Sequence, residues 1–130
     1  MRILVGYDGS NVSKEAIAIA EQHAQVFNAE IILAYSMVGG PEVPRRDFEQ
    51  AENDLEYEKN VLLEKKIPCD SILSVRGLEA GEDLVQIAAE KKVDEIIIGV
   101  KRRSKVGKLI FGSTAQYVIL NAPSPVVAVK

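Results

Sequence analysis

Asp8 is the first residue in the sequence whose type and position could bind a ligand. It follows a short apolar run, Arg2 to Tyr7, and precedes Gly9-Ser10. Its carboxylate can accept hydrogen bonds from hydroxyl groups such as those of a ribose. Aspartate is also favoured at turns and helix caps, so a role in capping the turn into the next helix explains Asp8 equally well. The residues alone leave both roles open.

A second stretch, from Gly99 to Ser113, has the residue types of an anion site. Gly99 ends an apolar run and permits both a tight turn and the close approach of a ligand. Gly112 and Ser113 open a predicted helix, whose first N–H groups have no partner within the helix and can bind an anion. The segment between them contains five cations and no acid: Lys101, Arg102, Arg103, Lys105 and Lys108. A capped helix behind a solvated basic loop has the same pattern, so this motif alone does not decide the matter.

Two common phosphate-binding motifs are absent from the sequence. A Walker loop requires Gly-Lys followed by Ser or Thr, whereas Gly107-Lys108 is followed by Leu109. The dinucleotide pattern G-x-G-x-x-G is also missing after the first apolar run. Any nucleotide site is therefore of another type.

The elements that must position these residues alternate along the chain. Five apolar runs bounded by turn residues predict strands over residues 2–7, 30–36, 70–75, 95–99 and 126–129. Apolar residues spaced three and four apart predict four helices. The first runs from Ser13 through Phe27, the second covers residues 46–65, and the fourth begins at Gly112. The third follows a turn at Gly77 to Gly81 and is marked by Leu84, Ile87 and Ala88. This alternation predicts an α/β domain over residues 1–130, with a parallel sheet covered by helices on both faces.

Ligands of such sheets bind beyond the carboxyl ends of the strands, where the direction of winding reverses. If the strand order is 3-2-1-4-5, the reversal lies between the first and fourth strands. Their carboxyl ends are at Asp8 and Gly99, so topology and residue chemistry point to one place.

The composition restricts the class of partner and the compartment. The net charge is −3, and outside residues 101–108 the chain carries 11 of its 16 cations against all 19 acids. This acidic body and an aromatic content of 5% disfavour nucleic-acid binding. Cys69 has no second cysteine to pair with, no apolar run has the length of a membrane helix, and no signal-peptide pattern is present. We therefore expect a soluble cytoplasmic protein.

Over nearly its full length, the sequence resembles the universal stress protein family. The matching features are Asp8-Gly9-Ser10 after the first strand, Gly99 followed later by Gly112-Ser113-Thr114-Ala115, and the ending Asn121 to Val129 with its Pro-Val strand. The resemblance implies an open, doubly wound, five-stranded parallel sheet of order 3-2-1-4-5, similar to the adenine nucleotide alpha hydrolases. It also implies a homodimer that pairs through the C-terminal strand, Val126 to Val129.

The resemblance further implies a site for ATP, ADP or AMP. The motif of the ATP-binding branch is Gly, two residues, Gly, nine residues, Gly, and then Ser or Thr; Gly99, Gly112 and Ser113 match it, but Arg102 replaces the middle glycine. An arginine there either obstructs the phosphates, turns outward or binds phosphate as a cation, and retained nucleotide binding is the favoured interpretation. By resemblance, Asp8 would hold the adenosine, Gly99 would lie near the ribose, and the Ser36 backbone would lie beside the adenine. Gly112, Ser113 and Thr114 would bind the phosphates, which would in turn hold any Mg²⁺ or Mn²⁺.

Three functions fit this reading. The first is a dimeric regulatory module of the stress response that binds an adenine nucleotide. The second is a slow metal-dependent ATPase, although no water-positioning residue can be identified and a fast enzyme is not expected. The third is a nucleotide-free dimeric interaction protein whose site is closed by Arg102.

Overall fold

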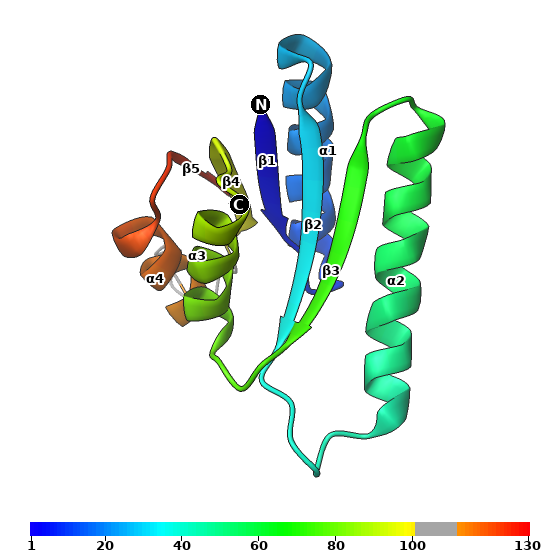
Figure 1. Cartoon of the computed structure of the whole chain (residues 1–130), viewed down its shortest axis with the longest axis vertical. Coiled ribbons are helices and arrows are strands. Elements are labelled where there is room, and N and C mark those ends of the chain that lie inside the picture. The colour runs from blue at the N-terminus through cyan, green and yellow to red at the C-terminus, as the bar shows by residue number, and fades with distance from the viewer. Residues whose placement is uncertain (101–111) are drawn as a thin grey trace.

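The computed structural model describes residues 1–100 and 112–130. The strands form one parallel sheet of order β3-β2-β1-β4-β5, which confirms the predicted fold class and order (Figure 1). The strands are β1 (Arg2–Gly6), β2 (Glu30–Met37), β3 (Cys69–Val75), β4 (Glu95–Gly99) and β5 (Val126–Val129). The helices are α1 (Asn11–Phe27), α2 (Arg45–Glu64), α3 (Ala80–Glu90) and α4 (Ser113–Asn121).

β1 lies at the centre of the sheet, between β2 and β4. Val5 is paired with Leu33 on one side and with Ile97 on the other. The chain therefore builds outward from β1 to β2 and β3, and then returns to place β4 and β5 on the opposite side. This is the reversal of winding direction that the predicted order requires.

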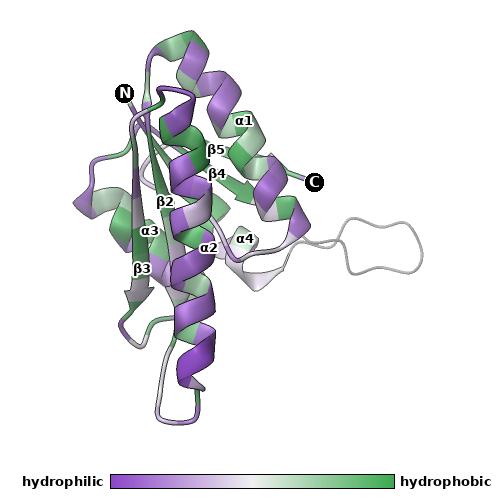
Figure 2. Ribbon diagram, turned by 90° about the vertical axis from the view of Figure 1, so that its right-hand side faces the viewer, coloured by the Kyte–Doolittle hydropathy of each residue, from purple (hydrophilic) through white to green (hydrophobic). Residues whose placement is uncertain are grey.

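Two apolar cores lie on opposite faces of the sheet. Side chains alternate between them along each strand: Ile3 and Val5 enter the core under α1 and α2, whereas Leu4 enters the core under α3 and α4. Burial on both faces explains why the inner strands are continuous apolar runs in the sequence. Figure 2 shows that α2 is mostly hydrophilic; its buried residues are Ala51, Leu55 and Leu62.

Helix α1 begins two residues before the predicted start. Ser10 is its N-cap, because the Ser10 side chain accepts a hydrogen bond from the backbone N–H of Ser13 at 3.2 Å. Ser13 is instead buried within the helix, and its hydroxyl donates to the carbonyl of Ser10 at 2.8 Å. The apolar spacing of Ile17, Ala20, Ala24 and Phe27 predicts one buried face for this helix, but Phe27 is 56% exposed at the last turn, so its part of this prediction is wrong.

Helix α3 also begins earlier than the sequence indicates. The sequence predicts a turn at Gly77 to Gly81, but the helix starts at Ala80 and contains Gly81. A Cβ atom at Gly81 would lie 2.8 Å from the Cβ of Tyr117 in α4. This glycine therefore permits the close packing of two helices, which explains why its presence was misleading as a turn signal.

β5 forms one edge of the sheet. It pairs with β4, as in Ile97↔Val127, and within the described residues its other edge faces no further strand. Ala128 in this strand is exposed, and so are Ile119 and Leu120 in the last turn of α4. None of the described helices is long and apolar enough to span a membrane.

Candidate functional site

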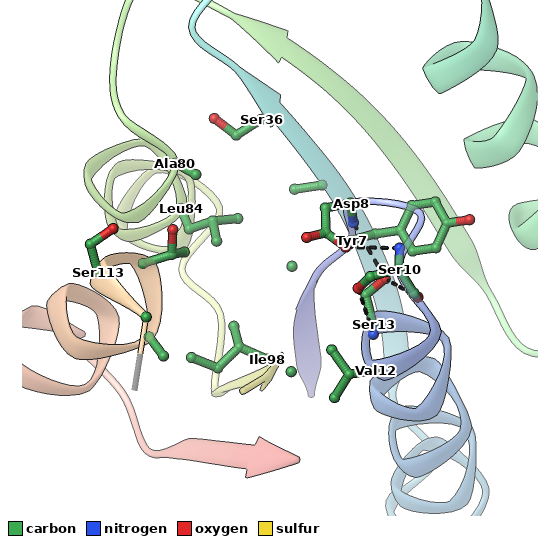
Figure 3. Close-up of a pocket in the computed structure, with 16 residues that line it drawn as sticks. Tyr7, Asp8, Ser10, Val12, Ser13, Ser36, Ala80, Leu84, Ile98 and Ser113 are labelled. Atoms are coloured by element: carbon green, nitrogen blue, oxygen red, sulfur yellow. Dashed lines mark hydrogen bonds between the residues drawn. The ribbon is translucent and has the colours of Figure 1, made fainter. Parts of the chain in front are cut away.

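A cleft lies beyond the carboxyl ends of β1 and β4, at the point where the winding reverses (Figure 3). Its cavity volume is about 150 Å³, and the space around it is open to solvent. Figure 3 shows Ala80, Leu84 and Ser113 on one side of the cleft, and Asp8, Ser10 and Val12 on the other. Helices α3 and α4 thus form one wall, and the β1–α1 connection forms the opposite wall.

Six of the residues predicted from the sequence line this one cleft. They come from four separate parts of the chain: Asp8, Ser36, Gly99, Gly112, Ser113 and Thr114. The seventh, Arg102, lies outside the described residues.

Asp8 has the capping role that the sequence left open, and it also faces the cleft. Its Oδ1 accepts a hydrogen bond from the backbone N–H of Ser10 at 2.9 Å, and its own N–H donates to Ser13 Oγ at 3.4 Å. These bonds fix the turn between β1 and α1, while the side chain is exposed and lines the cleft. A ligand hydroxyl at this position would meet a carboxylate that is already oriented.

Gly99 has a packing role at the floor of the cleft. A Cβ atom there would lie 2.7 Å from Val12 Cγ1 and 3.0 Å from the backbone carbonyl carbon of Val12. The end of β4 therefore touches the first turn of α1, and a larger residue would push them apart. Packing alone accounts for this glycine, so its position near a ribose stays a prediction.

Gly112 differs from Gly99 because nothing in the described structure requires a glycine there. Its φ of −67° and ψ of 163° are open to any residue. A Cβ atom would meet no described atom within 4 Å beyond its chain neighbours. As the N-cap of α4, Gly112 supplies no side-chain cap for the first N–H groups of the helix. A glycine here leaves space in front of those N–H groups, as an anion site requires.

Tyr7 lies at the back of the β1–α1 wall. Its ring packs edge-on against Tyr35, with the ring centroids 5.9 Å apart. Burial, followed by the negative charges of Glu58 and Asp54, raises the pKa of Tyr7 to about 12. The phenol is therefore protonated and neutral at physiological pH.

Asp83, a fully buried carboxylate beside the cleft, was not predicted from the sequence. Its exposed fraction is 0%, and it accepts hydrogen bonds from Ser36 Oγ at 2.5 Å and from Arg76 Nε at 2.6 Å. Burial by itself would raise the pKa of this carboxyl. Hydrogen bonds from Ser36, Ser74 and Arg76, with the charge of Arg76, nevertheless hold the pKa of Asp83 below its ordinary value.

The helical spacing contained a signal for Asp83. It lies four residues before Ile87 and next to Leu84, so the periodicity that predicts the helix also places Asp83 on its buried side. A charged residue on a buried face needs partners. The partner Ser36 is 47 positions away, which sequence spacing could not reveal.

A metal site built by the protein alone is absent from the described residues. None of them form a group of three or more His, Cys, Asp or Glu side chains that could hold a metal ion. The cleft offers hydroxyls, one carboxylate and helix N–H groups, which suit a phosphorylated polyol rather than a bare cation.

Comparisons with known proteins agree with the fold. A universal stress protein of Thermus aquaticus is 32% identical over 134 residues, which cover 98% of this chain and 97% of the relative. The structure of a universal stress protein from Archaeoglobus fulgidus aligns with a TM-score of 0.87 and 30% identity, and covers 100% of this chain and 93% of the other.

A second structure from Archaeoglobus fulgidus is of the universal stress protein in complex with dAMP. It aligns with a TM-score of 0.84 and 27% identity, over 100% of this chain and 98% of that one. The model of the universal stress protein family matches residues 1–130. The chain therefore belongs to the universal stress protein family.

Proposed function

We propose that this protein binds an adenine nucleotide (ATP, ADP or AMP) in the cleft and acts as a dimeric regulatory module in a cytoplasmic stress response. The observation that carries the proposal is that residues from five separate segments line one cleft at the reversal of the sheet. The complex of the Archaeoglobus fulgidus relative with dAMP supports an adenine nucleotide as the ligand.

Each wall of the cleft suits a different part of a nucleotide. The oriented carboxylate of Asp8 would accept hydrogen bonds from the ribose hydroxyls. The uncapped start of α4, with the exposed hydroxyls of Ser113 and Thr114, would bind the phosphates. Ser36, at the end of β2, would lie beside the base. A Mg²⁺ or Mn²⁺ ion would be held through the phosphates.

Binding is favoured over turnover. Asp8 is the only carboxylate among the described residues that line the cleft, and one of its oxygens is engaged by Ser10. Hydrolysis requires an oriented water and stabilisation of the transition-state charge. We therefore expect regulation by nucleotide occupancy, with slow metal-dependent hydrolysis as the second candidate.

The proposed dimer forms through the outer edge of β5. An edge strand with unpaired backbone groups invites pairing with another strand. Leu120, which is 81% exposed, adds apolar surface close by in the chain. Ala128 is exposed on this strand, so Ala128→Arg should shift the protein to a monomer in light-scattering measurements while leaving its fold unchanged by circular dichroism.

Thermal unfolding with and without ATP and Mg²⁺ tests the proposal, after the purified protein has been checked for bound nucleotide. ATP at 100 times its dissociation constant should raise the free energy of unfolding by about 2.7 kcal/mol. Arg102→Gly is the companion variant. A response in the wild-type protein means that Arg102 is tolerated, and a response in the variant alone means that Arg102 closes the site. If millimolar ATP stabilises neither protein, nucleotide binding is refuted.

A further inference from the structure

Ser36 belongs both to the cleft and to a buried polar network. It lines the cleft near Ala34 and Leu84, and its hydroxyl donates to Asp83 Oδ2 at 2.5 Å. On the side away from Ser36, Asp83 Oδ1 accepts from Arg76 Nε, and Arg76 also pairs with Glu90 at 2.9 Å. The network therefore connects the lining of the cleft to a salt bridge near the surface.

The Ser36 hydroxyl has only one direction in which to donate. A serine hydroxyl carries a single proton and two lone pairs, and an ionised carboxylate can only accept. Asp83 is ionised at neutral pH because its hydrogen bonds and the Arg76 charge lower its pKa. If the Ser36 proton turned toward the cleft, the fully buried carboxylate of Asp83 would lose a hydrogen bond. Hydrogen bonds to a charged group are stronger than those between neutral groups, so this rotation is unfavourable. Where a ligand in the cleft reaches the Ser36 hydroxyl, it therefore meets a lone pair and not the proton.

This arrangement distinguishes two kinds of ligand. A group with an N–H can donate to the Ser36 oxygen. A carbonyl oxygen at the same place would face a lone pair with no proton between them, and would lose the hydrogen bonds that it makes in water. Adenine carries an amino group at position 6, and hypoxanthine carries a carbonyl oxygen there, while the two rings have the same shape.

We propose that Asp83 is a positioning residue that orients the Ser36 hydroxyl as an acceptor, so that the cleft selects 6-amino purines over 6-oxo purines. This inference rests on the proposed function, because it requires the base to lie beside Ser36. It goes beyond the expectation that Ser36 contributes only its backbone, and it assigns a role to a side chain outside the cleft.

The inference is tested by the ratio of the dissociation constants of IMP and AMP, measured by calorimetry. We expect the wild-type protein to bind AMP at least about tenfold more tightly than IMP. AMP gains a hydrogen bond to Ser36, whereas the carbonyl oxygen of IMP is left without a partner there. Ser36→Ala should bring the ratio toward one. Asp83→Asn should lower it further or invert it, because the amide can donate to Ser36 and so release the serine proton toward the cleft.

Two variants provide matched controls. Ser71→Ala removes a hydroxyl from β3 at a position outside the cleft, and Glu82→Gln neutralises an exposed carboxylate next to Asp83. Both should keep the wild-type ratio within twofold. If Asp83→Asn does not fold, Ser36→Ala decides the matter, since Ser36 is half-buried and its truncation leaves the backbone unchanged.

The outcomes separate this inference from the proposed function. An equal affinity of the wild-type protein for AMP and IMP, or an unchanged ratio in Ser36→Ala, overturns the role of the Ser36–Asp83 pair while nucleotide binding stands. Failure of the wild-type protein to bind either nucleotide overturns the proposed function, and this inference with it.

Discussion

Replacing Gly112 by aspartate should stabilise the free protein and weaken its response to nucleotide. Gly112 already has the extended conformation of an N-cap, and a Cβ atom there meets no described atom within 4 Å beyond its chain neighbours. Aspartate can therefore cap α4, which glycine cannot do with a side chain. The same carboxylate would stand where the phosphates of a nucleotide are proposed to bind.

The two effects have opposite signs and different sizes. Replacing glycine by a capping residue gains a few tenths of a kcal/mol. A negative charge at a helix N-terminus adds about 0.3–1 kcal/mol. Against the ligand, two like charges about 4 Å apart repel by about 1 kcal/mol in bulk water and about 4 kcal/mol at an effective dielectric constant of 20. The start of α4 is exposed, so nucleotide affinity should fall between about fivefold and a thousandfold.

The assay is thermal unfolding in the absence of ligand and with ATP and Mg²⁺ at 100 times the wild-type dissociation constant. If the affinity of Gly112→Asp falls a hundredfold, ligand stabilisation falls from about 2.7 to about 0.4 kcal/mol. Gly112→Asn is the matched control, since it has the same shape and the same capping ability without the charge. An ATP response in Gly112→Asp equal to that of Gly112→Asn would refute the placement of the phosphates at the start of α4.

Three further predictions concern the framework of the cleft. Gly99→Ala should lower the free energy of unfolding by about 1–3 kcal/mol in urea titrations, because its Cβ would overlap Val12. Adding Val12→Ala should restore part of this stability. If Gly99→Ala causes no loss, the packing role of Gly99 is contradicted. Ser10→Ala should cost about 0.5–2 kcal/mol by removing the cap of α1, whereas the neighbouring exposed change Asn11→Ala should have little effect. The lowered pKa of Asp83 means that its ionised form stabilises the native state fully above about pH 4, its unfolded value, and that this contribution is lost as the pH falls through its lower native pKa. Asp83→Asn should thus show a weaker dependence of stability on pH below pH 4 than the wild-type protein, and parallel acid titrations of the two would argue against the network.

The inner strands could be predicted because burial on both faces leaves a direct mark in the sequence. Ile31 to Ala34 and Ile96 to Ile98 are uninterrupted apolar runs, as a strand between two layers of helices requires. The order of the strands cannot be predicted from local patterns, because an apolar run does not indicate which strand lies beside it. The order was implied by the family resemblance of the motif residues.

The site residues were predictable where chemistry and topology coincide, and not elsewhere. Asp8 lies in the short connection between β1 and α1, and Gly112 directly precedes α4, so their place beside the sheet follows from the alternation of strands and helices. Gly99 and Gly112 look alike in the sequence but have different structural roles. Only three-dimensional contacts distinguish a glycine required for packing from one with open space in front of it. Asp83 was overlooked because its partners, Ser36 and Arg76, become neighbours only when α3 packs on the sheet.

The contact between Gly81 and Tyr117 has a consequence for the energetics of the cleft. It holds α3 against α4 with almost no space between their side chains, so these two helices form one rigid wall of the cleft. The position of Leu84 relative to Ser113 and Thr114 on this wall is thereby set before any ligand arrives. A pre-organised site loses little conformational entropy when it is filled, so more of the interaction energy is expressed as affinity. Tyr117 and Gly81 would in this way strengthen the binding of a molecule that neither of them touches.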